Sequence, residues 1–264
     1  MIKDLSSALM IRVPLLPAVI GLLVLATAPA PAQVLVNYTF ENLTNGALVG
    51  QDGWTAGGTA SPVIANGPVG SVDTTKVAAN ATSAGVAVAK KNFFGAGSLS
   101  SSSIVTLQVD VSRAAGGTNI NGFGIGSSSV MSAYFGIAGN TFIIRDEAYG
   151  TTFNATNLTA NIGDWYTVQS VWDLSTGTGS LFVKNLTAGQ TSFTQLTFGA
   201  QSTVTLGLTT AVDTWTTAYV RLADSGASAS YLDNISAVAV PEPATLSLLL
   251  GLGLFVILLR RKSH

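Results

Sequence analysis

Residues 104–111 alternate apolar and polar side chains, and this period of two constrains the fold more than any other feature of the sequence. Successive side chains of a β-strand point to opposite faces, so the apolar residues at odd positions would face a core and the polar residues the solvent. The same alternation recurs over 166–174. A Thr/Gly-rich turn at 175–179 follows, and it predicts a hairpin with residues 181–183.

Short strands are expected along the whole region between the two termini. Gly139 and Asn140 predict a second hairpin, and no segment shows a helical period with caps. The other expected strands are 34–40, 86–93, 123–125, 134–137, 141–145, 193–198, 204–208, 218–222 and 231–238.

About a dozen short strands without crossover helices predict an all-β fold, an antiparallel sandwich of two sheets. Barrel closure is the alternative, and the long Gly/Ser-rich connections favour the sandwich. Residues 33–239 have a suitable length for one such domain and can bury a core without disulfides. The chain has no cysteine, which excludes thiol nucleophiles, thiolate zinc sites and iron–sulfur ligation.

The N-terminus has the three parts of a secretory signal peptide. Lys3 and Arg12 form a short basic region, an apolar run follows over 13–28, and residues 30–32 are a small-x-small triplet. Cleavage after this triplet would remove residues 1–32 on export. A retained membrane anchor is the alternative, which the short, proline-containing run disfavours.

The C-terminal segment 240–264 also has three parts: a polar triplet, an uncharged apolar run and a basic cluster. At 1.5 Å per residue the run reaches about 24 Å, which crosses a bilayer core with some local thinning. The basic end should stay cytoplasmic and place the rest of the protein outside. The three parts are Pro241-Glu242-Pro243, residues 244–259 and Arg260-Arg261-Lys262.

This order of parts resembles the PEP-CTERM sorting signal of exported bacterial proteins. The resemblance implies transient membrane anchoring through a C-terminal transmembrane helix and processing near Pro241 by an exosortase-type membrane peptidase. The processed protein would then lie at the cell surface or outside the cell. Sorting systems of this type accompany exopolysaccharide production, so contact with such a glycan is also implied.

The exported domain is weakly acidic. The chain has 12 basic and 13 acidic residues, of which five basic and two acidic ones lie outside residues 33–239. The domain therefore keeps 7 basic and 11 acidic residues, a net charge of −4. Since no basic stripe remains, nucleic-acid binding is excluded as a function class.

The residue types restrict the possible catalysis. His264, the one histidine, lies beyond the apolar run, so the domain cannot use a Ser-His-Asp triad, a histidine base or a histidine-ligated zinc site. A glycosidase needs two carboxyl groups about 5–9.5 Å apart. The two glutamates of the domain, Glu41 and Glu147, are distant in sequence. Asp146 and Glu147 would point to opposite faces of a strand and are interpreted as solvated charges at a hairpin end.

Several short motifs resemble those of concanavalin-like (laminin-G-like) jelly rolls, which often precede this sorting tail. The resemblance implies a jelly-roll topology for the sandwich. The motifs are Phe40-Glu41, residues 50–54 (GQDGW), residues 164–168 (DWYTV), Trp172-Asp173, residues 180–183 and residues 231–235 (YLDNI).

Four tryptophans suggest sugar stacking, because exposed aromatic faces are common platforms for pyranose rings. Trp172 belongs to the inward set, and Trp165 would lie on the opposite face of the same strand. Trp54 in a Gly-rich loop and Trp215 in a polar stretch are the best candidates for glycan binding. Packing in the core or anchoring of a loop is the alternative for each.

Glu41 ends the first expected strand and Asp233 lies in the last. Jelly rolls commonly place these strands side by side, and carbohydrate-binding modules of similar shape often hold a structural calcium ion where terminal strands meet. The resemblance therefore implies a Ca²⁺ site with Glu41, Asp233 and carbonyl oxygens among six to eight ligands. The alternative is that Asp233 and Asn234 cap a bend in the strand.

Together these observations predict a non-enzymatic cell-surface or extracellular-matrix protein that recognises polysaccharide. Two alternatives remain open. One is a glycan-active enzyme, a glycoside hydrolase or lyase on a jelly roll, with Glu147 in its site. The other is a structural, adhesive coat protein without a defined ligand.

Overall fold

The computed structural model describes residues 32–68, 76–80, 85–101, 103–113, 120–147, 150–207, 212–224 and 230–241. The expected signal peptide, the apolar C-terminal run and its basic cluster lie outside these ranges. Among the described residues no helix combines the length and apolarity needed to cross a membrane.

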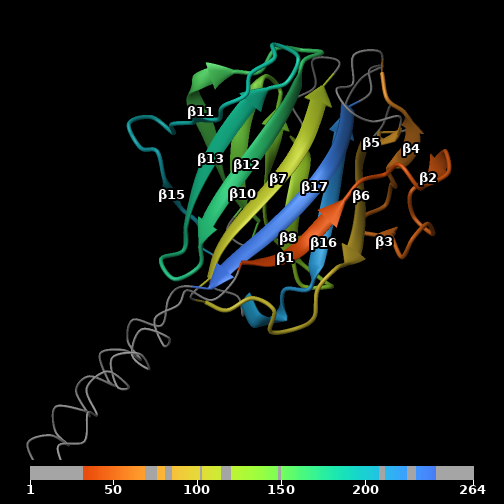
Figure 1. The fold of residues 1–264 in the computed structure, drawn as a ribbon, viewed down its shortest axis with the longest axis horizontal. Coiled ribbons are helices and arrows are strands. Elements are labelled where there is room, and N and C mark those ends of the chain that lie inside the picture. The colour runs from red at the N-terminus through yellow and green to blue at the C-terminus, as the bar shows by residue number, and fades with distance from the viewer. Residues whose placement is uncertain are drawn as a thin grey trace, which may run out of the picture. The chain divides into compact units, whose positions relative to one another are not determined.

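Two antiparallel sheets make up the fold, and Figure 1 shows them stacked face to face, with β7 and β17 of one in front of β8 and β16 of the other. Sheet A has the order β14-β13-β12-β7-β17-β5-β4-β2, with β1 beside β17 and β15 beside β13. Its strands are β1 (Gln33–Tyr38), β2 (Gly46–Ala47), β4 (Val63–Asn66), β5 (Lys76–Ala79), β7 (Ser103–Arg113), β12 (Trp165–Asp173), β13 (Thr178–Asn185), β14 (Thr194–Gln195), β15 (Val204–Thr205) and β17 (Ser230–Pro241).

Sheet B has the order β11-β10-β9-β8-β16-β6-β3. A short 3-10 helix, Val212–Thr214, precedes β16. The strands of sheet B are β3 (Thr55–Ala56), β6 (Gly85–Asn92), β8 (Ile120–Gly126), β9 (Met131–Ala138), β10 (Thr141–Asp146), β11 (Thr151–Thr159) and β16 (Thr217–Asp224).

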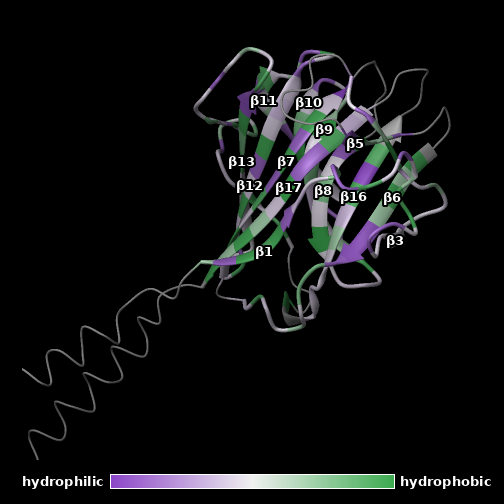
Figure 2. Ribbon diagram, turned by 45° about the vertical axis from the view of Figure 1, so that its right-hand side comes forward, coloured by the Kyte–Doolittle hydropathy of each residue, from purple (hydrophilic) through white to green (hydrophobic). Residues whose placement is uncertain are grey.

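The core lies between the sheets, and the alternation in β7 decides which of its side chains enter it. Val105, Leu107, Val109 and Val111 have no exposed surface, whereas the residues between them are half-buried. Figure 2 shows the corresponding bands of hydrophobic and hydrophilic residues along the strands. The predicted two-sheet antiparallel sandwich is thus confirmed.

Both predicted hairpins are confirmed. β9 and β10 pair around Gly139 and Asn140, and β12 pairs with β13 around the turn at 174–177. Two expected strands are shorter than predicted, since only Thr194–Gln195 and Val204–Thr205 form ladders. The sequence did not predict β11, a mostly exposed edge strand whose one buried side chain, Ala155, leaves no apolar alternation to detect.

Candidate functional site

The two tryptophans expected to stack on sugar are buried, each with 1% of its surface exposed. Trp54 packs among Tyr38, Phe40 and Phe93, with ring centroids 5.7, 6.0 and 5.9 Å away. Trp215 meets the inward-facing Trp172 edge to face at 6.3 Å. Because a sugar needs an exposed ring face, the glycan-binding role predicted for Trp54 and Trp215 is wrong.

Trp165, on the outer face of β12, is covered as well. It is 4% exposed and lies 6.3 Å from the ring of Tyr231 on β17. All four tryptophans therefore stabilise the sandwich, and none offers a free platform.

The first and last strands are neighbours, as expected, because β1 pairs with β17 in antiparallel register. Glu41 accepts a hydrogen bond from the backbone N–H of Lys76 at 3.1 Å, and Asp233 accepts one from the N–H of Asn234 at 2.8 Å. Asn234 has a left-handed φ of 47° at the bulge in β17, which agrees with the alternative of a strand bend. Among the described residues no three His, Cys, Asp or Glu side chains gather as a metal site. The calcium site stays a prediction.

Asp146 and Glu147 have different environments, as the strand alternation predicts. Asp146 is 2% exposed and accepts a hydrogen bond from the N–H of Gly207. It is therefore a buried anchor, and its interpretation as a solvated charge is wrong. Glu147 is half-buried and forms an ion pair with Arg145, with 2.9 Å between Oε2 and Nε.

A row of polar and aromatic residues crosses the outer face of sheet B. Lys90 on β6, Tyr219 on β16, Gly124 on β8, Tyr134 on β9 and Arg145 on β10 lie directly opposite one another in register. Each of them has at least one chain neighbour in the core between the sheets. Since side chains alternate along each strand, the row points away from that core.

Glycines form the middle of this face. β8 contributes Gly122, Gly124 and Gly126, with no side chain between them on the outer side. A Cβ atom at Gly122 would lie 1.9 Å from the carbonyl oxygen of Phe135, and one at Gly124 would lie 2.5 Å from that of Ala133. The contact of β8 with β9 therefore requires glycine. These three glycines, here called the glycine strip, carry no side chain of their own and are buried.

Arg221 on β16 reaches across the glycine strip. It lies opposite Gly122, yet its Cζ is 5.1 Å from the ring centroid of Tyr134, which is on β9 beyond β8. The two strands are about 10 Å apart, so the side chain extends over the strip to form a cation–π contact. Burial raises the pKa of Tyr134, and the positive charge of Arg221 acts in the opposite direction.

The three cations of the face have different partners. Arg145 binds Glu147 and donates to Thr152 Oγ1 at 3.3 Å. Lys90 Nζ donates to the carbonyl oxygen of Ser128 at 2.6 Å. Among the described residues, Arg221 has no carboxylate within ion-pair distance, and its buried Nε has no acceptor. One guanidinium is thus held in place by an aromatic ring and not by an anion.

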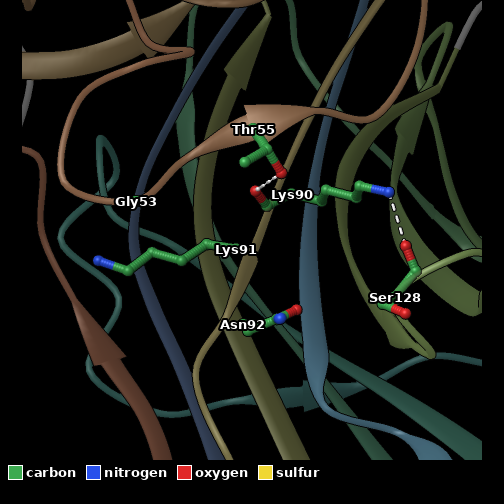
Figure 3. A pocket seen from close by; sticks show the side chains of 6 residues that line it. All are labelled: Gly53, Thr55, Lys90, Lys91, Asn92 and Ser128. Atoms are coloured by element: carbon green, nitrogen blue, oxygen red, sulfur yellow. Dashed lines mark hydrogen bonds between the residues drawn. The ribbon is translucent and has the colours of Figure 1, made fainter.

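A pocket of about 290 Å³ lies at the β3–β6 end of the face. In Figure 3 the side chain of Lys90 extends toward Ser128, whereas Lys91 points the other way. Lys91 forms an ion pair with Asp52 at 2.6 Å. The pocket is lined by Gly53, Thr55, Lys90, Lys91, Asn92 and Ser128.

Tyr219 fixes the loop beside this pocket. Its hydroxyl donates to the carbonyl oxygen of Ser127 at 2.5 Å, and burial raises its pKa to about 12. The phenol therefore stays protonated and keeps its hydrogen bond throughout the physiological pH range.

Sequence reasoning missed this face because each strand contributes only one or two of its residues. The alternating glycines of 122–126 were the one local signal, and they fit a glycine strip better than a phosphate-binding loop, because they lie inside β8 and precede no helix.

The fold is similar to those of several solved structures. Lectin II from Ulex europaeus has a TM-score of 0.50 and 8% identity, covering 78% of this chain and 99% of the lectin. The globular domain of T. cruzi calreticulin has a TM-score of 0.49 and 9% identity, covering 78% and 88%. The glycoside hydrolase family 131 catalytic domain from Coprinopsis cinerea has a TM-score of 0.45 and 8% identity, covering 78% and 94%. Of these three, the lectin alone reaches a TM-score of 0.50, and at 8% identity its likeness concerns the fold alone.

No curated protein matches the sequence. The C-terminal segment does match a known motif, and β17 extends through Pro241, so the motif begins inside the last strand of sheet A. The chain carries a PEP-CTERM protein-sorting motif at residues 239–262, which indicates export and processing by an exosortase.

Proposed function

We propose that this exported protein is a non-enzymatic surface protein, anchored transiently through its C-terminal helix, that binds polysaccharide on the outer face of sheet B. The observation that carries the proposal is the glycine strip with Arg221 stretched across it to Tyr134. Arg221, Lys90 and Arg145 are each partly exposed, so an extended polar ligand can reach their charged groups from outside.

The dimensions of the face suit an extended ligand. From Lys90 on β6 to Arg145 on β10 the row crosses five neighbouring strands, a width of about 19 Å. The middle residues of the row are buried, so several sugar units would span this width and contact the partly exposed cations. Their hydroxyl groups would meet the guanidinium groups, the Glu147 carboxylate and the hydroxyls of Thr55 and Thr152.

The same face supports binding better than hydrolysis. Glycosidases use two carboxyl groups, and Glu147 is the one acidic side chain that the described strands and turns place on this face. Its carboxylate is also paired with Arg145. Tyr134, the aromatic group nearest to Arg221, has no exposed surface, so a substrate could not reach its hydroxyl as a lyase base requires.

Glu147→Gln separates a binding protein from an enzyme. The full chain, purified in detergent, is applied to an array of neutral and charged polysaccharides, and release of sugar fragments is measured in parallel. We expect binding without release, and we expect Glu147→Gln to retain the binding. Fragment release that Glu147→Gln abolishes would establish the enzyme instead. Absence of binding to every polysaccharide would overturn the proposal in favour of a coat protein without a ligand.

A further inference from the structure

We infer that the outer face of sheet B recognises an anionic polysaccharide whose sugar units carry carboxylate groups, with Arg221 and Lys90 as the groups that bind them. This inference rests on the proposed function and names its class of ligand. It follows from how charge is distributed over the fold and from the state of the two cations.

Positive charge is concentrated on this face of an acidic domain. Residues 33–239 have 7 basic and 11 acidic residues, yet Lys90, Arg145 and Arg221 all point outward from sheet B. Glu147 is the one acidic residue facing them from the described strands and turns. A local positive potential attracts an anionic chain to this face, whereas the remaining surface repels it.

Arg221 is prepared for a carboxylate. Its guanidinium is held over the ring of Tyr134 at 5.1 Å, the side chain is half-buried, and no described carboxylate lies within ion-pair distance of it. Guanidinium groups bind carboxylates through two parallel hydrogen bonds. Because the aromatic contact already orders the side chain, a ligand would bind it with little further loss of side-chain entropy.

Lys90 supplies a second positive charge beside it. Lys90 lies on β6 opposite Tyr219, and Arg221 is two residues farther along β16. Such diagonal neighbours are about 7–8 Å apart at their Cα atoms, within reach of one extended ligand. Lys90 Nζ donates to a neutral backbone carbonyl, that of Ser128, and no carboxylate of the described residues lies within ion-pair distance of it.

A neutral glycan would gain less from this arrangement. Sugar hydroxyls form hydrogen bonds with guanidinium and ammonium groups, but hydrogen bonds between charged partners are about twice as strong. Of the anionic groups found on polysaccharides, the carboxylate has the planar shape that matches a guanidinium edge. Sulfate is the alternative anion, and the experiment includes it.

The test uses four probes: polygalacturonate, its fully methyl-esterified form, neutral dextran and dextran sulfate. Binding of the full chain in detergent is measured at low and at high salt. We expect polygalacturonate to bind at least about tenfold more tightly than its ester and than dextran, and high salt to weaken this binding. Stronger binding to dextran sulfate than to polygalacturonate would overturn the choice of carboxylate.

Three variants locate the site. Arg221→Gln should weaken polygalacturonate binding about tenfold or more, the size of a lost charged hydrogen bond. Lys90→Gln should weaken it less, and it provides an independent test if Arg221→Gln fails to fold. Lys184→Gln is the matched control, because Lys184 lies on the outer face of sheet A opposite Thr167 and should leave binding unchanged.

The possible failures are distinct. Equal binding of polygalacturonate and its ester, or binding that neither Arg221→Gln nor Lys90→Gln weakens, would overturn this inference and leave polysaccharide binding intact. Loss of binding in Lys184→Gln alone would place the ligand on sheet A and also overturn it. A chain that binds none of the four probes or any other polysaccharide would overturn the proposed function itself.

Discussion

The outer faces of the two sheets have the same alternating pattern but opposite charge. On sheet A, Asp110 of β7 lies directly opposite Asp233 of β17, and Lys184 is the basic residue that the described part of this face presents. On sheet B, Arg221 and Lys90 point outward. A binary pattern of apolar and polar residues therefore predicts which side chains face solvent, but not the potential that they create.

The two faces also differ in how their charges are satisfied. Asp110 accepts hydrogen bonds from Thr167 Oγ1 at 2.7 Å and from Asn234 Nδ2 at 2.9 Å. Arg221 contacts the ring of Tyr134 and no described carboxylate. Sheet A thus uses its outer polar groups for its own structure, whereas on sheet B one cation has no described anionic partner.

The largest effect should come from the core, which supports both faces. Trp215→Ala removes a side chain with 1% exposure and should lower the free energy of unfolding by about 3–5 kcal/mol. Urea denaturation followed by fluorescence measures this. The control is Phe193→Ala, at a residue that is 36% exposed, with an expected loss below about 1 kcal/mol. If Trp215→Ala lost polysaccharide binding at unchanged stability, Trp215 would be a glycan-binding residue after all, as the sequence suggested.

The glycine strip should be the most sensitive part of sheet B. Gly122→Ala places a methyl group 1.9 Å from the carbonyl oxygen of Phe135 and should cost about 3 kcal/mol of unfolding free energy, because the backbone of β9 would have to shift. Gly95→Ala is a matched control, since its nearest atom, Ser98 Oγ, would be 3.9 Å away. Thermal unfolding that does not distinguish these variants would contradict the close contact of β8 and β9.

A smaller effect is expected at the edge of sheet A, where Asp164 connects β12 and β13. Hydrogen bonds from Asn185 Nδ2 at 2.8 Å and Asn161 Nδ2 at 3.0 Å hold the pKa of Asp164 below its ordinary value of 3.8. A carboxyl group with a lowered pKa stabilises the fold at pH values above its unfolded-state pKa. This contribution is lost as the pH falls through the folded-state pKa.

Asp164→Asn should therefore cost less than about 1 kcal/mol at neutral pH, since the site is near the surface. It should also make the stability of the protein depend less on pH below about 4. Denaturation curves recorded between neutral and acidic pH compare the variant with the wild type. Parallel curves for the two proteins would show that the Asp164 hydrogen bonds do not stabilise the fold.

The smallest effect concerns calcium on sheet A. Glu41 and Asp233 already accept hydrogen bonds from backbone N–H groups, which a cation would have to replace in part. Calcium at about 10⁻³ M should therefore raise the melting temperature by only about 2 °C, and Asp233→Asn should remove the rise. The same melting temperature with calcium and with a chelator would reject the site.

Local sequence determined much of the architecture. The alternation over 104–111 predicted the inward side chains of β7, and Gly139-Asn140 predicted the turn between β9 and β10. These features depend on backbone geometry within a few residues, which is why one sequence suffices to detect them. The sorting motif was equally readable, because a Pro-Glu-Pro triplet, an apolar run and a basic cluster are contiguous.

Only the tertiary structure decided the environment of the side chains. Trp54 and Trp215 lie in polar, Gly-rich surroundings in the sequence, yet their segments pack against the core and bury both rings. Lys90, Arg145 and Arg221 meet on one face through strand pairings such as that of β6 with β16, which lie more than a hundred residues apart. Such pairings depend on the packing of the whole sandwich. No local pattern therefore predicted the charge of its outer faces.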